Sequence, residues 1–294
     1  MRNSSPAALL VVFTWSAVGC INPLPGSLPS TTSDPAALEL LAASAEAHGG
    51  DKRFAEVTSI KVGYDGEWLN NVWKLQPMLV DRDYRKSSVE RIEYGRGWPI
   101  VTQTHTGPDA GIKEVRWPAA KPQDDTLDGG ASVIYDGQRI EDPAERVRQE
   151  EASAMVAEAY RMFLTGPFYF TQRQGVGQTT DRMTAVMRKP TTVLGAECDQ
   201  VLVELRPGFG TSEVDRVEVA IDRETKYVRR VRFSLDGFRK TKGATADVEF
   251  SNFVERDGLI FPTEFLEIVV HPINREVHEW YVTDLSVEFQ SAAE

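Results

Sequence analysis

Alternating apolar and polar residues, broken by short turns, run through the last third of the chain and restrict its fold more than any other feature. Val217, Val219 and Ile221 lie on one face of a predicted strand that ends at a turn over residues 222–225. Further strands are predicted at residues 227–235, 246–253, 263–271 and 276–289. Strands joined in series by such short turns pair as antiparallel neighbours. This part of the chain therefore predicts an antiparallel β-meander.

The earlier part of the chain predicts more strands, four of them linked in pairs by tight turns. Strand-like segments lie at residues 58–64, 67–75, 87–94, 99–106, 131–135, 138–141 and 201–205. We expect hairpin turns at the Asp-Gly pairs of residues 65–66 and 136–137, because Asp-Gly is a strong signal for a two-residue hairpin loop.

Two helices are predicted from their capping residues. Asp34 precedes Pro35 and Asp142 precedes Pro143, and an aspartate before a proline is typical of a helix start. We expect the first helix to end at His48, where a cation would favour the helix dipole, and the second to span residues 144–164. The second helix has an apolar stripe made of Val147, Met155, Ala159, Met162 and Phe163.

Apolar residues occur on both faces of several late strands, as in Phe265 and Val269 on one side and Leu266, Ile268 and Val270 on the other. A sheet covered on both sides is expected if it curls around helices. The predicted fold class is therefore α+β, mostly β, with a single curved antiparallel half-barrel sheet packed around a few helices.

The N-terminus has the features of an export signal. Arg2 precedes an uncharged stretch from Ala7 to Gly19, which is too short for a transmembrane helix and suits a signal peptide. It ends at Ala17-Val18-Gly19-Cys20, which resembles a bacterial lipobox, although Ala17 stands where leucine is usual. We predict a signal peptide over residues 1–19 and lipid attachment at Cys20. The alternatives are ordinary cleavage that leaves Cys20 unmodified, or a retained buried helix.

The residues after Cys20 are uncharged and rich in proline, serine and threonine. This composition predicts a flexible tether over residues 20–33, followed by one domain over residues 34–294. Lipidation would leave Cys198 as an unpaired cysteine. We interpret it as a small buried apolar residue and not as a reactive thiol, because no basic side chain lies beside it in the sequence.

Four short motifs resemble those of a group of bacterial periplasmic lipoproteins of unknown function. They are AHGG at residues 47–50, LTGPF at 164–168, VAIDRET at 219–225 and GLIFPT at 258–263. This group belongs to the wider superfamily of lipoprotein-sorting carriers and receptors (LolA/LolB-like). The resemblance covers residues 36 to 289 and implies a half-open β-barrel closed by helices, with a concave side that takes acyl chains. The motifs are turns and packing positions, so they imply the fold more than the function.

Charge and motifs argue against several function classes. The net charge of −11 is dispersed without a basic stripe, which excludes nucleic acid as an expected partner. The sequence has no HExxH, GxSxG or CxxC motif, and we predict no catalytic residue, metal or cofactor. A metal site that includes Glu276 and His278 is the alternative, and a hydrogen-bonded strand histidine is the simpler interpretation.

Aromatic residues are the candidates for a hydrophobic binding site. Residues 163–170 (FLTGPFYF) form either a lid over the concave face or ordinary core between a helix and a strand. The candidate ligand-binding residues are Trp68, Trp73, Phe168, Phe170, Phe233, Phe250, Phe265 and Trp280. Aromatic residues at such positions are more often part of the core than ligand contacts.

These observations favour a tethered periplasmic lipoprotein that binds a hydrophobic small molecule or acyl chain. A lipid at Cys20 would hold it at a membrane, so that it acts as an acceptor or sensor and not as a diffusing shuttle. Ile21 after the cysteine favours the outer membrane over the inner one. The alternatives are a module that binds another envelope protein without a ligand, and a hydrolase or metal-dependent enzyme.

Overall fold

The computed structural model describes residues 24–25, 28, 32–95, 99–118, 131–175 and 183–290. Within these ranges the strands form one 13-stranded sheet in the order β6-β5-β4-β3-β2-β1-β13-β12-β11-β10-β9-β8-β7. The strands are β1 (Val57–Trp68), β2 (Ser87–Glu93), β3 (Ile100–Thr106), β4 (Ile112–Pro118), β5 (Ser132–Tyr135), β6 (Gln138–Arg139), β7 (Met183–Val193), β8 (Ala196–Leu205), β9 (Asp215–Asp222), β10 (Val228–Ser234), β11 (Thr245–Arg256), β12 (Leu259–His271) and β13 (Arg275–Phe289). The helices are α1 (Pro35–Ala47), α2 (Asp51–Phe54), η1 (Val72–Lys74), α3 (Pro77–Val80), α4 (Pro143–Thr165), α5 (Pro167–Gly175) and η3 (Arg239–Thr241).

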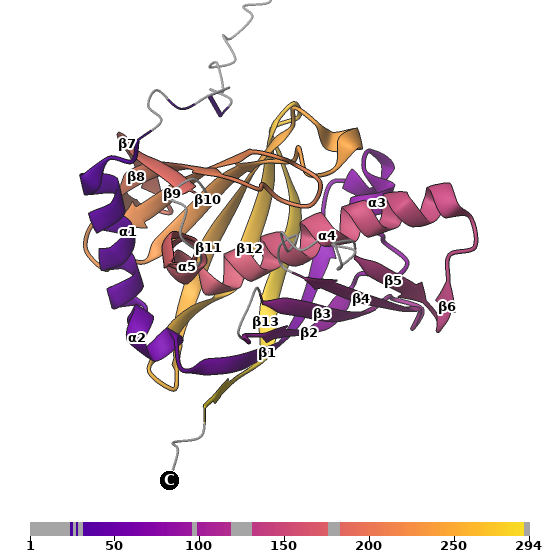
Figure 1. Ribbon diagram of the computed structural model, residues 1–294. Coiled ribbons are helices and arrows are strands. Elements are labelled where there is room, and N and C mark those ends of the chain that lie inside the picture. Colours follow the sequence, from indigo (N-terminus) through magenta and orange to yellow (C-terminus); the bar gives the residue numbers. More distant parts are fainter. Residues whose placement is uncertain are drawn as a thin grey trace, which may run out of the picture.

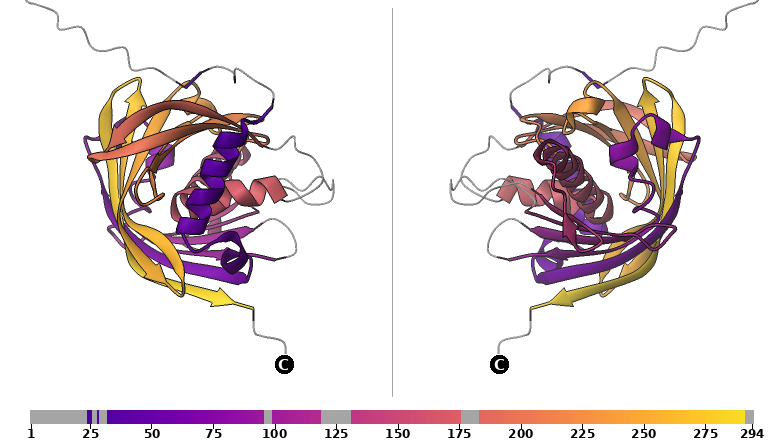
Figure 2. Two further views of the ribbon diagram at one scale, coloured as in Figure 1. Left: turned by 90° about the vertical axis from the view of Figure 1, so that its left-hand side faces the viewer. Right: turned by 90° about the vertical axis from the view of Figure 1, so that its right-hand side faces the viewer.

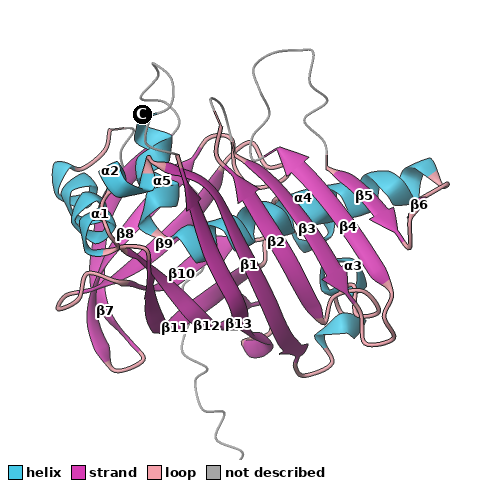
Figure 3. Cartoon of the chain, turned by 90° about the horizontal axis from the view of Figure 1, so that it is seen from below, coloured by secondary structure: helices cyan, strands magenta, loops and turns pink. Residues whose placement is uncertain are grey.

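The sheet consists of two meanders, one from β1 to β6 and one from β7 to β13. All strand pairs are antiparallel, and the pairing of β1 with β13 joins the two meanders. The sheet bends around α4 and α5, as the two side views in Figure 2 show. Helix α4 lies along the concave side, across the strands (Figures 1 and 3). The predicted fold class, a curved antiparallel half-barrel around a few helices, is confirmed.

Helix α4 supplies the centre of the core through its second half. Its side chains are buried almost continuously from Ala152 to Thr165. The prediction that Val147 belongs to the buried stripe is wrong, because this side chain is 47% exposed. The first turns of α4 precede the part of the helix that packs against the sheet, so their apolar residues remain in solvent.

The AHGG motif at residues 47–50 joins α1 to the hairpin between β11 and β12. The His48 carbonyl accepts a hydrogen bond from Ile260 N at 2.9 Å, and Gly49 adopts a φ of +116°. A Cβ on Gly49 would lie 2.2 Å from the Gly258 carbonyl oxygen. The motif thus contains a glycine because two backbones approach closely there, and because L side chains rarely adopt that φ.

His48 caps α1 as predicted, but it does so as a neutral side chain. Its Nδ1 donates to the Ser44 carbonyl at 2.8 Å, and its ring is buried. Burial lowers the pKa of His48 to about 4, so the ring carries no charge at neutral pH. The expected favourable interaction of a cation with the helix dipole is therefore wrong.

The predicted hairpin turn at residues 65–66 is also wrong, because β1 continues through it to Trp68. Gly66 pairs with Trp280 of β13, and a Cβ on Gly66 would lie 2.4 Å from the Glu279 carbonyl oxygen. The glycine therefore serves close strand packing and not a turn. The strand ends before Asn70 and Asn71, which both have positive φ, so the predicted strand at 67–75 is replaced by η1.

Several elements lack a clear sequence signal. Strands β4 and β7 and helices α3 and α5 were not predicted, and α5 begins inside the aromatic run of residues 163–170. The predicted turns at 136–137 and 222–225 are confirmed. Asp136 and Gly137 have positive φ, and the Asp222 carboxylate accepts hydrogen bonds from the backbone N–H groups of Glu224 and Thr225.

Cys20 and most of the predicted tether lie outside the described residues. The last part of the tether contacts the sheet: Ser33 Oγ accepts from Ala185 N at 3.1 Å, and Asp34 N donates to the Ala185 carbonyl at 2.8 Å. These bonds attach the chain to β7 at the edge of the sheet. Over the described ranges, every helix is too short or too polar to cross a membrane.

Candidate functional site

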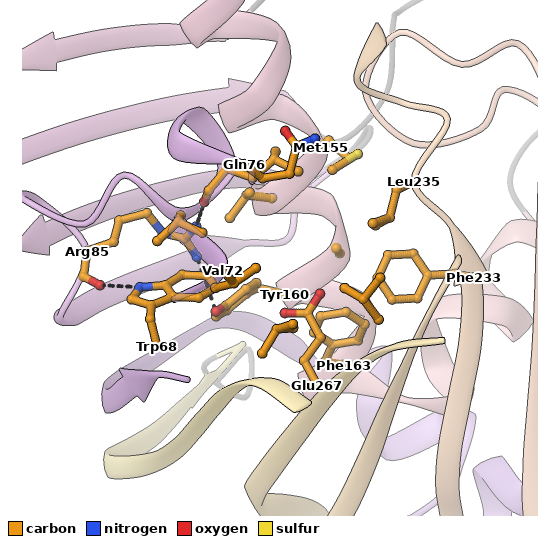
Figure 4. A pocket seen from close by; sticks show the side chains of 16 residues that line it. Trp68, Val72, Gln76, Arg85, Met155, Tyr160, Phe163, Phe233, Leu235 and Glu267 are labelled. Carbon is orange, nitrogen blue, oxygen red and sulfur yellow. Dashed lines mark hydrogen bonds between the residues drawn. The ribbon is translucent and has the colours of Figure 1, made fainter. Parts of the chain in front are cut away.

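An apolar pocket, which we call the inner pocket, lies between α4 and the concave face of the sheet. Figure 4 shows the side chains that line it. Its free volume is about 70 Å³. Its lining comes from three parts of the chain: the segment after β1, the middle of α4, and strands β10, β12 and β13. The lining residues are Trp68, Val72, Gln76, Leu79, Val80, Arg85, Met155, Val156, Ala159, Tyr160, Phe163, Phe233, Leu235, Glu267, Val269 and Val277.

A second and larger pocket, the outer pocket, adjoins the inner one. Its free volume is about 450 Å³, and Val72, Gln76, Leu235 and Val269 line both pockets. The outer pocket is also bordered by the segment after β10 and by the β12–β13 turn. Its remaining lining residues are Leu75, Lys240, Thr241, Lys242, Gly243, Ala244, His271, Pro272 and Ile273. Since they share these four residues, the two pockets adjoin, and we call the two together the groove.

One end of the inner pocket is polar and centres on Arg85. The Arg85 side chain is 7% exposed, and its guanidinium donates to the Leu79 carbonyl and, at 3.2 Å, to the Tyr160 hydroxyl. The Arg85 carbonyl accepts from Trp68 Nε1 at 2.9 Å. Figure 4 shows the guanidinium beside Trp68 and Tyr160. Three elements thus meet at this cation, namely β1, the segment before β2, and α4.

His278 lies next to this cluster. Its ring stacks on Trp68 with 3.8 Å between centroids, and its Nδ1 is 3.2 Å from the Tyr160 hydroxyl. Burial and the nearby charge of Arg85 lower the pKa of His278 well below its usual range. The ring is therefore neutral, and one of its nitrogens can exchange a hydrogen bond with Tyr160.

Glu267 is the carboxyl group of the inner pocket. It comes from β12, where its neighbours Leu266 and Ile268 are apolar, and Figure 4 shows its carboxyl group beside Phe163 and Tyr160. Burial raises the pKa of Glu267 to about 7, although the charge of Arg85 opposes this rise. Near neutral pH this group therefore exists in both protonated and ionised forms.

The predicted aromatic candidates divide into three sets. Trp68 and Phe233 line the inner pocket. Trp280, Phe265 and Phe250 form a buried aromatic cluster outside its lining: the rings of Phe265 and Trp280 stack at 5.0 Å, and the ring of Phe250 meets that of Phe265 edge-on at 5.8 Å.

The other three candidates line neither the inner nor the outer pocket. Trp73 packs in a small separate cluster beside Val72, under the side chains of Lys74 and Arg82. Phe168 and Phe170 are fully buried, and the ring of Phe168 stacks on Phe54. Whether any of the eight residues contacts a ligand stays a prediction.

Sequence reasoning missed the polar residues of the site. Arg85 lies in a segment that resembles a loop, and Tyr160 is one of many residues on α4. A signal did exist for Glu267, because this carboxyl group lies between the apolar residues Leu266 and Ile268 of β12. Charged groups at such positions are rarely buried without a specific reason.

Two observations concern the alternatives of a metal-dependent enzyme and of a reactive thiol. Across residues 32–95, 99–118, 131–175 and 183–290, no three His, Cys, Asp or Glu side chains are placed to hold a metal ion. Cys198 is buried, and burial raises the pKa of its thiol. This agrees with its interpretation as an apolar residue of the sheet.

No family model and no curated protein matches the sequence. Solved structures do match. A domain from Vibrio parahaemolyticus described as an outer membrane lipoprotein-sorting protein matches with 11% identity and a TM-score of 0.44, over 88% of this chain and 94% of that one. A DUF1329 family protein from Desulfovibrio piger matches with 11% identity and a TM-score of 0.49, over 89% and 96%. A LolA superfamily protein from Nitrosomonas europaea matches with 11% identity and a TM-score of 0.37, over 87% and 94%.

Proposed function

We propose that this chain is a membrane-tethered periplasmic lipoprotein whose half-barrel binds a hydrophobic ligand, such as an acyl chain, in the groove. The observation that supports the proposal is that the inner and outer pockets adjoin. Apolar side chains from α4 and from the sheet line the inner pocket, and four of its lining residues also line the larger outer pocket. Pockets of this kind are common sites for small apolar molecules.

The size of the hydrophobic effect supports an acyl chain as the ligand. Each buried CH₂ group contributes about 0.8 kcal/mol, so half of a 16-carbon chain contributes roughly 6 kcal/mol before the costs of binding. The inner pocket alone, at about 70 Å³, is too small for a whole chain. The chain would therefore extend through the outer pocket as well.

Direct binding tests this proposal. The mature chain, residues 20–294 with Cys20→Ser to leave out its own lipid, is titrated with a fluorescent fatty-acid probe. We expect saturable binding at micromolar probe and displacement by unlabelled hexadecanoate. A linear, non-saturating signal, or no displacement, would contradict a specific site.

The tether restricts the role of such a binder. A lipid at Cys20 would keep the domain at one membrane, for which we propose the outer membrane, so it would receive or sense its ligand there. The hydrogen bonds of Ser33 and Asp34 to Ala185 attach the end of the tether to the body.

Lipid attachment is tested by metabolic labelling in the producing cell. We expect alkyne-palmitate to label the full-length wild-type protein and to leave Cys20→Ser unlabelled, because the thiol is the acceptor of the lipid. Cys198→Ser serves as the control and keeps the label, since Cys198 is buried within the sheet. Equal labelling of wild type and Cys20→Ser would mean that Cys20 carries no lipid anchor.

A further inference from the structure

Arg85 is a buried cation without a carboxylate partner. The described residues place no carboxylate oxygen within 4.0 Å of its guanidinium, although other buried or half-buried arginines of the sheet have such partners. Its hydrogen bonds go to two neutral oxygens, those of the Leu79 carbonyl and the Tyr160 hydroxyl. Buried charges in proteins are normally paired, because desolvation of an unpaired charge is costly.

Lys113, another buried cation, shows the contrast. Lys113 is as well buried as Arg85, and its Nζ lies 2.7 Å from a carboxylate oxygen of Asp81. Tyr135 donates a further hydrogen bond to the same Asp81 oxygen at 2.7 Å. Lys113 thus has its counter-ion within the chain, whereas Arg85 does not.

Two acidic side chains lie farther from Arg85 and compensate its charge only in part. These are Glu90 and Glu267, and burial raises the pKa of each to about 7. The rings of Trp68 and Tyr160 lie 5.2 and 5.5 Å from the guanidinium carbon and add a weaker attraction. Free space borders Arg85 as well, because Arg85 and Tyr160 line both the inner pocket and a small polar pocket of about 20 Å³.

We propose that Arg85 binds the carboxylate of a long-chain fatty acid, whose hydrocarbon chain lies in the groove. This inference rests on the proposed function and names the class of ligand. A guanidinium matches a carboxylate through two parallel N–H donors, and the nitrogens of Arg85 are not all used by Leu79 and Tyr160. The small volume of the polar pocket favours a carboxylate over the phosphate diester of a phospholipid, which carries a second substituent.

The test compares ligands that share one chain and differ in their polar group. Hexadecanoate, hexadecanol and hexadecyl phosphate each displace the fluorescent probe from the mature chain with Cys20→Ser. We expect hexadecanoate to bind at least tenfold more tightly than hexadecanol, because a buried charge-assisted hydrogen bond is worth about one order of magnitude or more. In Arg85→Gln this preference should disappear, while the affinity for hexadecanol changes less than threefold.

Two further variants separate the effect of Arg85 from that of any positive charge near the groove. Arg85→Lys retains the charge and should retain part of the preference. Lys242→Gln removes a cation that lines only the outer pocket, and the preference should be unchanged. If Arg85→Gln does not fold, the comparison of the wild type with Arg85→Lys still tests the role of Arg85, because the loss of the guanidinium should weaken the preference, whereas Lys242→Gln should leave it unchanged.

The outcomes distinguish this inference from the proposed function. Equal binding of hexadecanoate and hexadecanol, tighter binding of hexadecyl phosphate, or a preference that persists in Arg85→Gln or is lost in Lys242→Gln would overturn the role of Arg85. In each of these cases binding to the groove would remain. Failure of all three ligands to displace the probe would instead overturn the proposed function itself.

Discussion

Replacement of Phe168 by alanine is expected to lower the free energy of unfolding by about 3–5 kcal/mol, as is usual for a large aromatic side chain lost from a packed core. The Phe168 side chain is 0% exposed. Its ring stacks on Phe54 at 4.2 Å and meets the ring of His48 edge-on at 6.4 Å. Since α1, α2 and α5 meet at this ring, its loss leaves a cavity that none of them can close alone.

Denaturant unfolding followed by circular dichroism measures this loss. Tyr281→Ala is the matched control, because Tyr281 is an aromatic residue of β13 that is 49% exposed. Its replacement should change the free energy of unfolding by less than about 1 kcal/mol. A loss smaller than about 1 kcal/mol for Phe168→Ala would show that residues 163–170 act as a displaceable lid and not as core.

Replacement of Glu267 by glutamine is expected to raise the free energy of unfolding relative to the wild type, and to do so more at alkaline pH than at acidic pH. Burial raises the folded-state pKa of Glu267 from 4.5 to about 7. Below pH 4.5 the carboxyl group is protonated in both the folded and the unfolded state. As the pH rises from 4.5 to about 7, ionisation favours the unfolded state, and the wild type loses stability. With about 1.4 kcal/mol for each pKa unit, this loss amounts to roughly 3 kcal/mol. The Glu267→Gln variant does not lose this stability, because its amide does not ionise.

The measurement is the difference in free energy of unfolding between Glu267→Gln and the wild type at about pH 5 and about pH 8. We expect the difference to move by about 2–3 kcal/mol in favour of the variant as the pH rises, because its amide mimics the protonated acid. Comparison with the wild type cancels the titration of the buried histidines and of Glu90. Glu279→Gln, at an exposed position of β13, is the matched control. A constant difference for Glu267→Gln would mean that Glu267 is solvated in the folded protein.

Local sequence patterns were sufficient to predict much of the fold. Alternation in β9 to β13, the turn at residues 222–225 and the capping aspartates of α1 and α4 all depend on neighbours within a few residues. The two-faced apolar strands further indicated that the sheet curves around helices. These signals are local, and the structure confirms them.

The errors arose where a distant part of the chain decides the conformation. Gly66 resembles a turn residue, yet it serves the contact between β1 and β13, which lie at opposite ends of the folded domain's sequence. Val147 fits the apolar periodicity of α4, but only the tertiary structure shows where the packed part of that helix begins.

The candidate site was less predictable than the fold. Aromatic content singled out eight residues, but a pocket and a core are lined by the same residue types. Only the folded chain shows that Trp68 and Phe233 border free space while Phe168 and Phe170 do not. Arg85, Tyr160 and Glu267 come from three separate segments, so no sequence window contains their cluster.

Binding of an apolar ligand in the groove beside α4 can be tested by one comparison of probe affinity. Val156 lines the inner pocket, and Val147 lies on the same helix with its side chain in solvent. A tryptophan at position 156 would occupy the free space of the inner pocket. We predict that Val156→Trp binds the fluorescent fatty-acid probe at least tenfold more weakly than the wild type, whereas Val147→Trp binds it with unchanged affinity. Equal affinity of the two variants would contradict binding in the groove and place the ligand elsewhere.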